Sequence, residues 1–322
     1  MEKMTLQVEH LSASFFTAKG EIKAVNDVSI NVPRRSVVGI VGESGCGKSM
    51  TARSILRLLK YPGKVVGGRI MLMNKELTAL SDAAMANVRG EEISMIFQEP
   101  MTSLNPVMKV GKQVQEAILL HRKISKKEAK AEVLRMFEQV GISEPEKRYN
   151  SYPHELSGGL RQRIMIAMAM ICRPKLLIAD EPTTALDVTV EAQILELMKS
   201  LRDTVDTSII LISHNLGVIA ELCDYVYVMY AGQVMEQADT FTLFKNPQHP
   251  YTKGLLASVR SLEDKNNTLE TIQGTVPNLL DMPEGCAFSP RCTHSCDKCR
   301  NAQMLIETEP NHLVRCHRAG EV

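Results

Sequence analysis

Short apolar runs along the chain alternate with stretches in which apolar residues recur at helical spacing. The runs "SVVGIVG" (36–42) and "EISMIFQ" (92–98) have the length and composition of buried strands, and a helical stretch that starts at Lys48 lies between them. Two further runs, "KLLIAD" (175–180) and "TSIILIS" (207–213), repeat the pattern around another helix. This alternation predicts a mostly parallel sheet of the α/β class.

From about 101 to 165 the pattern changes from alternating strands and helices to one that predicts helix. Within it, "SKKEAKAEVLRMFEQVG" spaces its apolar residues for one face of a helix. Ser125 and Glu128 predict a capping box at the start of that helix, and Gly141 predicts its end.

The last third of the chain begins with a predicted hairpin and then loses its regular pattern. "DYVYVMYAGQVME" (224–236) predicts two strands that turn at Ala231 and Gly232. Beyond "NPQHPYTKGLL" (246–256) the chain becomes polar and irregular, and "EDKNNT" (263–268) is a plausible linker into a cysteine-rich tail.

Composition narrows the class of protein. The 322 residues are 44% hydrophobic and 23% charged, which is typical of a folded globular chain with two or three cores and argues against disorder. The formal net charge of +1 provides no global field for nucleic acid or anionic lipid. The N-terminus lacks the pattern of a signal peptide, and apolar runs such as "IMIAMAMIC" (164–172) are about half of a membrane span. We therefore expect a protein that is cytosolic or peripheral to a membrane.

The stretch "GESGCGKS", Gly42 to Ser49, follows an apolar strand and opens a helix, which is the context of a phosphate-binding Walker A loop. Its glycines let backbone N–H groups surround phosphates, Lys48 reaches the terminal phosphates, and the Ser49 hydroxyl can ligate Mg2+. The alternative is an ordinary glycine turn, which the strand-loop-helix context disfavours.

Two more motifs can be interpreted as parts of a site for phosphate chemistry. "LLIADEP" (176–182) ends a strand in Asp180, placed to hold Mg2+ through water, and Glu181, placed to polarise an attacking water. "LSGGLRQR" (156–163) puts Ser157 at a helix start, where free N–H groups attract an anion. In isolation the acids could be solvated groups at a strand end, and the serine a simple helix cap.

In this order the motifs resemble the nucleotide-binding subunit of ATP-binding cassette (ABC) transporters, over about 230 residues. The resemblance implies an α/β fold. It consists of a P-loop NTPase (RecA-like) core with an antiparallel β subdomain and an inserted α-helical subdomain, plus a small cysteine-rich C-terminal extension. ATP and Mg2+ are the implied cofactors.

The resemblance assigns roles to further residues. Phe15 is expected to stack on adenine, although Phe16 competes for that role. Gln98 is expected to sense Mg2+ and the attacking water, and His214 to contact the γ-phosphate. The loop "TALD" (184–187) is expected to cross a dimer interface.

The implied site comprises three overlapping sets. The residues expected to contact nucleotide are Phe15, Gly42, Glu43, Ser44, Gly45, Cys46, Gly47, Lys48, Ser49, Met50, Gln98, Ser157, Gly158, Gly159, Asp180 and Asp187. The expected Mg2+ ligands are Ser49, Gln98 and Asp180, and the expected catalytic residues are Lys48, Gln98, Glu181 and His214. The resemblance also implies that two such subunits close head to tail around each ATP, so we expect a single chain to be nearly inert.

Two positions depart from the family pattern. Leu160 stands where the signature usually has glutamine or methionine, and Asn215 follows the histidine where aspartate is common. Neither change removes a group that contacts phosphate, so we expect both to be tolerated.

Longer stretches narrow the resemblance. "QEPMTSLNPVMKVGKQ" (98–113), "NPQHPYTKGLL" (246–256) and "GCAFSPRC" (285–292) are similar to the D-type ATPase of oligopeptide, dipeptide and nickel importers. The resemblance implies an ABC ATPase domain at 1–258, with its helical subdomain at about 101–165, and a transporter-type extension at 259–322.

That family implies a set of partners and a location. They are a homologous second ATPase, two membrane permeases and an extracytoplasmic substrate-binding protein, at the cytoplasmic face of the cell membrane. The implied cargo is a peptide or nickel, and no nucleic acid is expected as a partner. Two rivals are a soluble cassette ATPase that acts on nucleic acid or ribosomes with a zinc tail, and a catalytically dead cassette. The absence of a coiled-coil insert or a second cassette disfavours the first, and Glu181 with His214 disfavours the second.

Five of the eight cysteines lie between Cys286 and Cys316, which in a reducing cytosol suggests metal before disulfides. The resemblance implies a four-iron, four-sulfur (4Fe-4S) cluster, which some family members hold. Its expected ligands are Cys286, Cys292, Cys299 and Cys316, with Cys296 dispensable. Zinc is the alternative, although zinc sites favour pairs of ligands two to four residues apart in the chain. Free thiols without a metal are a third alternative.

Overall fold

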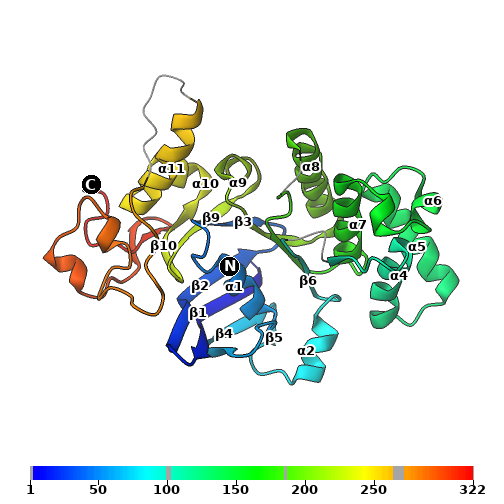
Figure 1. The fold of residues 1–322 in the computed structure, drawn as a ribbon, viewed down its shortest axis with the longest axis horizontal. Coiled ribbons are helices and arrows are strands. Elements are labelled where there is room, and N and C mark those ends of the chain that lie inside the picture. Colours follow the sequence, from blue (N-terminus) through cyan, green and yellow to red (C-terminus); the bar gives the residue numbers. More distant parts are fainter. Residues whose placement is uncertain (1–2, 99–102, 185–186, 264–271, 322) are drawn as a thin grey trace. The chain divides into compact units, whose positions relative to one another are not determined.

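The structure is a computed structural model that describes residues 3–98, 103–184, 187–263 and 272–321 (Figure 1). Its internal contacts divide the chain into two compact units. The first unit comprises Met1–Thr5, Pro33–Ser36 and Ala79–Ile210, and the second comprises Leu6–Val32, Val37–Thr78 and Leu211–Val322. Each unit is built around its own apolar residues.

The N-terminal part of the second unit is an antiparallel sheet with strand order β2-β1-β4-β5. Its strands are β1 (Met4–Thr17), β2 (Gly20–Pro33), β4 (Gly63–Leu72) and β5 (Lys75–Glu76). Strands β1 and β4 pair from Leu6 opposite Leu72 to Phe15 opposite Gly63, and Leu6, Leu11 and Ile70 are completely buried. The antiparallel β part of the predicted fold class is confirmed.

The rest of the second unit is built around a buried strand that pairs in parallel with another. Strand β3 (Val37–Val41) is parallel to β9 (Tyr225–Tyr230), and β10 (Gln233–Asp239) is antiparallel to β9. The hairpin predicted at Ala231 and Gly232 is confirmed, because both residues have positive φ and Gln233 pairs with Tyr230. The helices of this unit are α1 (Lys48–Ile55), α9 (Leu216–Leu222), α10 (Thr240–Lys245) and α11 (Pro250–Glu263).

The cysteine-rich tail extends this sheet. Strand β12 (His312–Val314) pairs with β10, and β11 (Ile306–Glu309) pairs with β12, all antiparallel. Two short 3-10 turns lie among the cysteines. The turn η2 (Ser289–Arg291) is followed by Cys292, and η3 (Asp297–Arg300) contains Cys299 and is preceded by Cys296. The rest of the described tail is mostly irregular, as the sequence predicts. Strands β11 and β12 are too short to leave a periodic pattern. Most of the predicted linker at 263–268 lies outside the described residues.

A buried carboxylate attaches the tail to the hairpin. Glu236 and His312 are both completely buried, with Oε1 of Glu236 2.7 Å from Nε2 of His312. The backbone N–H groups of Gln248 and His249 donate to the two carboxylate oxygens at 2.7 and 2.9 Å. A buried carboxylate is costly unless it is satisfied in this way, so β10, α11 and β12 depend on one another.

The first unit pairs two parallel strands and surrounds them with helices. Strand β6 (Ile93–Ile96) is parallel to β7 (Leu176–Asp180). The capping box of α5 is confirmed, since Ser125 Oγ accepts from the Glu128 N–H and a Glu128 carboxylate oxygen accepts from the Ser125 N–H. The helices are α2 (Asp82–Val88), α4 (Val110–His121), α5 (Lys126–Gln139), α6 (Pro145–Tyr149), η1 (Pro153–Glu155), α7 (Gly158–Met170) and α8 (Val188–Val205). Strand β8 (Ser208–Ile212) carries the chain across the boundary of the two units.

Among the described residues, no helix combines the length and the apolar character that a membrane crossing requires.

We expect His312→Ala to lower the free energy of unfolding by about 3 kcal/mol, because it leaves the buried Glu236 carboxylate short of a partner. His10→Ala is the matched control. His10 makes an equally short 2.7 Å contact with Asp27, but its side chain is 80% exposed, so its loss should cost less than about 1 kcal/mol. Urea titrations of the full chain measure both, and equal losses would contradict the role assigned to Glu236.

Candidate functional site

The glycine loop lies between β3 and α1, as the sequence predicts. A Cβ on Gly42 (φ +146°) would lie 2.2 Å from the carbonyl oxygen of Met229, and one on Gly47 (φ +106°) would lie 2.6 Å from that of Ala24. Only glycine fits these two positions, because both the space and the backbone conformation exclude a side chain. Gly47 is the N-cap of α1, so the first N–H groups of that helix face the loop.

Lys48 is folded back onto its own loop. Its ammonium donates to the carbonyl oxygens of Gly42 (2.7 Å) and Glu43 (3.0 Å), and the residue is only 6% exposed. A phosphate group offers an ammonium stronger acceptors than these carbonyls. Burial raises the pKa of the neighbouring Cys46 thiol, which keeps that thiol protonated.

The other loop residues are more open. Ser44 and Gly45 are exposed, while Ser49 and Met50 are partly buried in the first turn of α1. A Cβ on Gly45 would meet no atom within 4 Å. The loop therefore presents its middle to solvent and its two ends to the protein.

His214 lies near the loop's own strand in the second unit. The N–H of Ser213, the residue before it, donates to the carbonyl of Ile40 in β3 at 3.4 Å, and the His214 side chain is exposed. Asn215 is the N-cap of α9 and accepts from the N–H groups of Gly217 and Val218. An aspartate would cap the helix in the same way, which is a physical reason to expect that this departure from the family pattern is tolerated.

The two candidate adenine-stacking residues differ in environment. The ring of Phe15 is partly buried, and a Cβ on Gly63 would lie 2.5 Å from it. Phe16 is 45% exposed, and the ammonium of Lys64 lies 4.6 Å from its ring centroid.

The first unit brings Gln98 and Glu181 together. Asp180 ends β7 and is 1% exposed, and Glu181 follows it with a positive φ of 49°. Gln98 Nε2 donates to Glu181 Oε2 at 2.9 Å, and the hydroxyl of Thr184 donates to the same oxygen at 3.0 Å. A glutamine and a carboxylate that meet at a strand end form a suitable pair for orienting one water molecule.

The signature motif begins a helix, as expected. Ser157 is the N-cap of α7 and accepts from the N–H of Leu160 at 3.4 Å. Ser157 and Gly158 are exposed, whereas a Cβ on Gly159 would lie 2.9 Å from Val190. The exposed start of α7 can therefore receive an anion from outside this unit.

The predicted dimer-crossing loop is described only at its ends. Asp187 is exposed and is the N-cap of α8, and Ala185 and Leu186 lie outside the described residues. The sequence stretch at 98–113 likewise has residues 99–102 outside them.

The four cysteines with the family spacing line one small cavity in the tail, whereas Cys296 is exposed and is not among its lining residues. Burial raises the pKa of Cys286 to about 11 and raises the pKa values of Cys292 and Cys316. A metal centre would therefore have to displace protons from these thiols.

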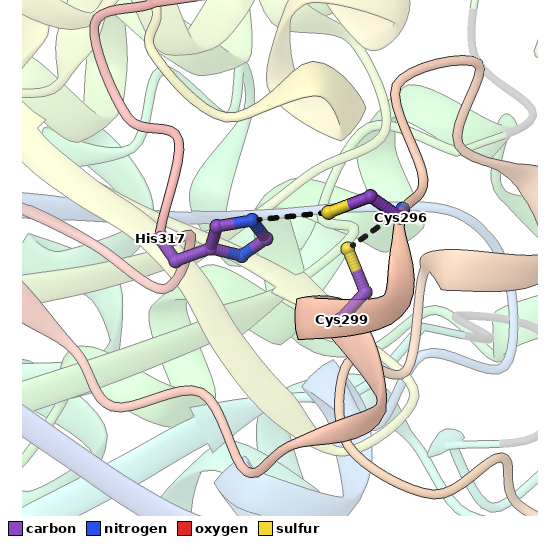
Figure 2. A group of neighbouring side chains, drawn as sticks. All are labelled: Cys296, Cys299 and His317. Carbon is purple, nitrogen blue, oxygen red and sulfur yellow. Dashed lines mark hydrogen bonds between the residues drawn. The ribbon is translucent and has the colours of Figure 1, made fainter.

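A second arrangement uses the extra cysteine. Figure 2 shows Cys296 beside His317, with Sγ and Nε2 3.4 Å apart, and the Cys299 thiol beside the Cys296 N–H. The ligand atoms of Cys296, Cys299 and His317 all lie within 4.8 Å of one another, which is close to the spacing around a single zinc ion. Sequence analysis missed His317, and its only local signal is its position next to Cys316.

Sequence analysis also missed two residues that contact the glycine loop. The hydroxyl of Tyr251 accepts from the Glu43 N–H at 2.9 Å, and the guanidinium of Arg291 pairs with the Glu43 carboxylate. Both residues lie in motifs that carry the family resemblance, but no local pattern points to these contacts.

Two family models match the chain. The model described as "ABC transporter" matches residues 25–184, and the model described as "Oligopeptide/dipeptide transporter, C-terminal region" matches residues 235–299. The resemblance seen in the sequence is therefore confirmed.

Curated relatives match along nearly the full chain. The dipeptide transport ATP-binding protein DppD of Bacillus subtilis is 51% identical over 98% of this chain and 95% of its own length. The oligopeptide transport ATP-binding protein OppD of Salmonella typhimurium is 48% identical over 98% and 94%. These names favour an importer over the rival ATPase that acts on nucleic acid or ribosomes.

Solved structures confirm the fold. The protein cbiO1 from Clostridium perfringens, part of the ABC transporter complex cbiONQ, has a TM-score of 0.65 and 28% identity over 76% of this chain and 92% of its own. The dimeric ATP-binding cassette MJ0796, bound to ADP and Pi, has a TM-score of 0.66 and 24% identity over 73% and 98%. The second likeness shows the fold alone.

We expect Gly42→Ala to raise the Kd for ATP by more than about tenfold, because the added methyl would displace the loop from Met229. Gly67→Ala, whose Cβ would come no closer than 3.9 Å to Ser12, is the control and should leave the Kd unchanged. Titration with a fluorescent ATP analogue measures both, and near-wild-type binding by Gly42→Ala would contradict the packing argument.

Proposed function

This chain belongs to the ABC transporter family, within its oligopeptide and dipeptide transporter group, and on that premise we propose that it hydrolyses ATP to power peptide import across the cytoplasmic membrane. The observation that supports this most is the full-length similarity to DppD, combined with a complete glycine loop and a hydrogen-bonded Gln98–Glu181 pair. Nickel, the other cargo of the family, is less supported, because the relatives named above are peptide transport proteins.

We propose that the loop binds the nucleotide through its backbone N–H groups and Lys48, whose ammonium moves from loop carbonyls to phosphate oxygens. Phe15 is the proposed adenine contact. The Ser49 hydroxyl, the Gln98 carbonyl and the Asp180 carboxylate are oxygen ligands of the kind that Mg2+ prefers. When bound, Mg2+ would neutralise charge on the phosphates.

We propose Glu181 as the general base. It takes a proton from water as the water oxygen bonds to the γ-phosphorus and the bond to the departing ADP oxygen breaks. The amide of Gln98, 2.9 Å from the carboxylate, holds it in place. Lys48 and His214 are proposed to stabilise charge on the transferring phosphoryl group.

We propose the partners from the exposed start of the signature helix and from the family. Ser157 and Gly158 are proposed to complete an ATP site on a homologous second ATPase, which would complete the site on this chain in return. Two membrane permeases and an extracytoplasmic substrate-binding protein would form the rest of the importer. The chain would then be peripheral, at the cytoplasmic face of the membrane, with no nucleic acid as partner.

For the tail we propose a 4Fe-4S cluster held by Cys286, Cys292, Cys299 and Cys316. The chemistry of the ligands supports this proposal, since four thiols around one cavity match the ligand set of such a cluster. A single zinc ion on Cys296, Cys299 and His317 is the alternative, and the two differ in whether Cys292 or Cys296 is required.

We expect Glu181→Gln to lower the kcat for ATP hydrolysis by about 10²- to 10⁴-fold while ATP still binds, because the amide keeps the shape but cannot accept the proton. Glu191→Gln is the matched control. It alters a carboxylate that accepts from the nearby Thr183 hydroxyl, and it should keep full activity. The measurement is phosphate release by the assembled transporter, and retained turnover at this chain's site would refute the role of Glu181.

For the tail, anaerobically purified protein should contain about four irons per chain and absorb broadly near about 400 nm. Cys292→Ser should remove the iron, whereas Cys296→Ser should keep it. Stoichiometric zinc that Cys296→Ser abolishes would establish the alternative, and protein without metal would refute both.

A further inference from the structure

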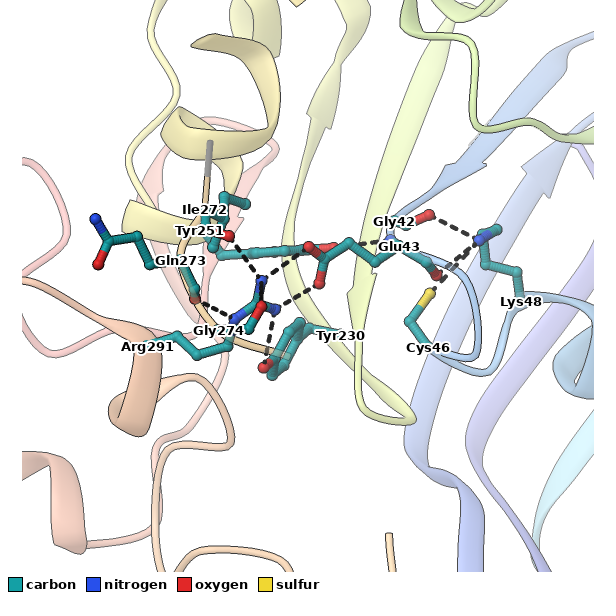
Figure 3. Close-up of polar contacts among 10 residues, drawn as sticks. All are labelled: Gly42, Glu43, Cys46, Lys48, Tyr230, Tyr251, Ile272, Gln273, Gly274 and Arg291. Carbon is teal, nitrogen blue, oxygen red and sulfur yellow. Dashed lines mark hydrogen bonds and ion pairs between the residues drawn. The ribbon is translucent and has the colours of Figure 1, made fainter. Parts of the chain in front are cut away.

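Arg291 forms a two-pronged ion pair with the glycine loop (Figure 3). Its two terminal nitrogens lie 2.6 and 3.0 Å from the two carboxylate oxygens of Glu43, the second residue of the loop. The Arg291 side chain is only 5% exposed. The Glu43 side chain is partly exposed, at 27%. A bidentate pair of this kind is directional, so it fixes the orientation of both side chains.

The remaining donors of Arg291 are used within the same unit. Nε donates to the carbonyl of Gln273 at 2.9 Å, and Nη2 donates to those of Ile272 and Gly274 at 3.3 and 3.2 Å. The hydroxyl of Tyr230, at the end of β9, accepts from Nη1 at 3.4 Å. The hydrogen bond to Glu43 is the largest of the effects that raise the pKa of Arg291, so the guanidinium stays charged.

Glu43 joins this contact to the phosphate-binding lysine. Its carboxylate holds Arg291, its N–H donates to Tyr251, and its carbonyl accepts from Lys48. A shift of Glu43 would therefore move the group that holds Lys48 and the loop backbone that would receive the phosphates.

Arg291 lies in a turn between two of the cysteines. It is the last residue of η2, whose Ser289 N–H donates to the Cys286 carbonyl, and Cys292 follows directly. Cys286 and Cys292 both line the cysteine cavity. Phe288, just before this turn, packs against Tyr230 and Tyr251, with distances between ring centroids of 5.4 and 5.3 Å.

We propose that Arg291 is a positioning residue for ATP binding, and that through its pair with Glu43 the cysteine-rich tail sets the affinity of the glycine loop for nucleotide. This inference rests on the proposed ATP-binding function and adds a connection between the two ends of the chain. An intact tail holds the loop in the form that binds ATP. A tail that has lost the group proposed for its four cysteines no longer holds the loop in that form.

The test is the Kd of the full-length chain for a fluorescent ATP analogue. Arg291→Met should raise the Kd about tenfold, and Arg291→Lys, which keeps the charge but not the two-pronged geometry, should give an intermediate value. The double variant with Glu43→Gln should be no weaker than Arg291→Met alone, because both changes remove the same contact. Arg300→Met, an exposed arginine of the same tail, is the control and should bind normally.

A second comparison tests the tail itself. Cys292→Ser should raise the Kd in the wild-type background and have no further effect in the Arg291→Met background. In the assembled transporter, Arg291→Met should raise KM for ATP and leave kcat nearly unchanged, since a purely catalytic defect would do the reverse. Thermal unfolding of each variant separates loss of the contact from loss of the fold, and Arg291→Lys covers the case in which Arg291→Met does not fold.

Additive effects of Arg291→Met and Glu43→Gln, or an unchanged Kd in Arg291→Met, would overturn the positioning role. An unchanged Kd in Cys292→Ser would overturn the link to the tail. Failure of the wild-type chain to bind ATP would instead overturn the proposed function.

Discussion

The close packing of the glycine loop backbone against the β9–β10 turn is the constraint on which the second unit depends. The carbonyl of Cys46 accepts from the N–H of Gly232, and the carbonyl of Gly232 accepts from Asn26. Gly42 and Gly47 have no space for a side chain at either end of the loop. Backbone packed this closely has few alternative conformations, so its N–H groups are already oriented before a nucleotide arrives.

The same hairpin also supports the tail, which gives the second unit a closed set of contacts. Strand β10 carries the buried Glu236, which holds His312 of β12, and the end of β9 carries Tyr230, which contacts both Phe288 and Arg291. Arg291 then returns to the loop through Glu43. The tail is therefore part of the unit that contains the glycine loop, and contacts between protein groups hold it there.

The first unit brings together the groups proposed to act in hydrolysis by a different principle. Strands β6 and β7 are parallel neighbours, so the residues that follow them emerge at the same edge. Gln98 and Glu181 meet there, and Thr184 adds a second donor to the same carboxylate oxygen. The positive φ of Glu181 is a strained conformation for a non-glycine residue, and such conformations concentrate at functional sites.

The amino-acid sequence by itself determined the features whose interactions are local. The glycine loop before Lys48, the cap at Ser157, the capping box at Ser125 and the hairpin turn all depend on residues within a few positions of one another, so their patterns are visible in the chain. The family resemblance added the details of the fold and the expected roles of Gln98 and His214, which no spacing could supply.

Only the tertiary structure decided which distant groups meet. Glu43 and Arg291 are 248 residues apart, Gln98 and Glu181 are 83 apart, and Glu236 lies 76 residues from His312. Contacts of this kind depend on how strands pair and how the tail packs on the sheet, and a single charged residue leaves no periodic signal of its partner. In the tail, the family resemblance singled out four cysteines as one ligand set, but only the fold shows that they line one cavity and that Cys296 lies beside His317.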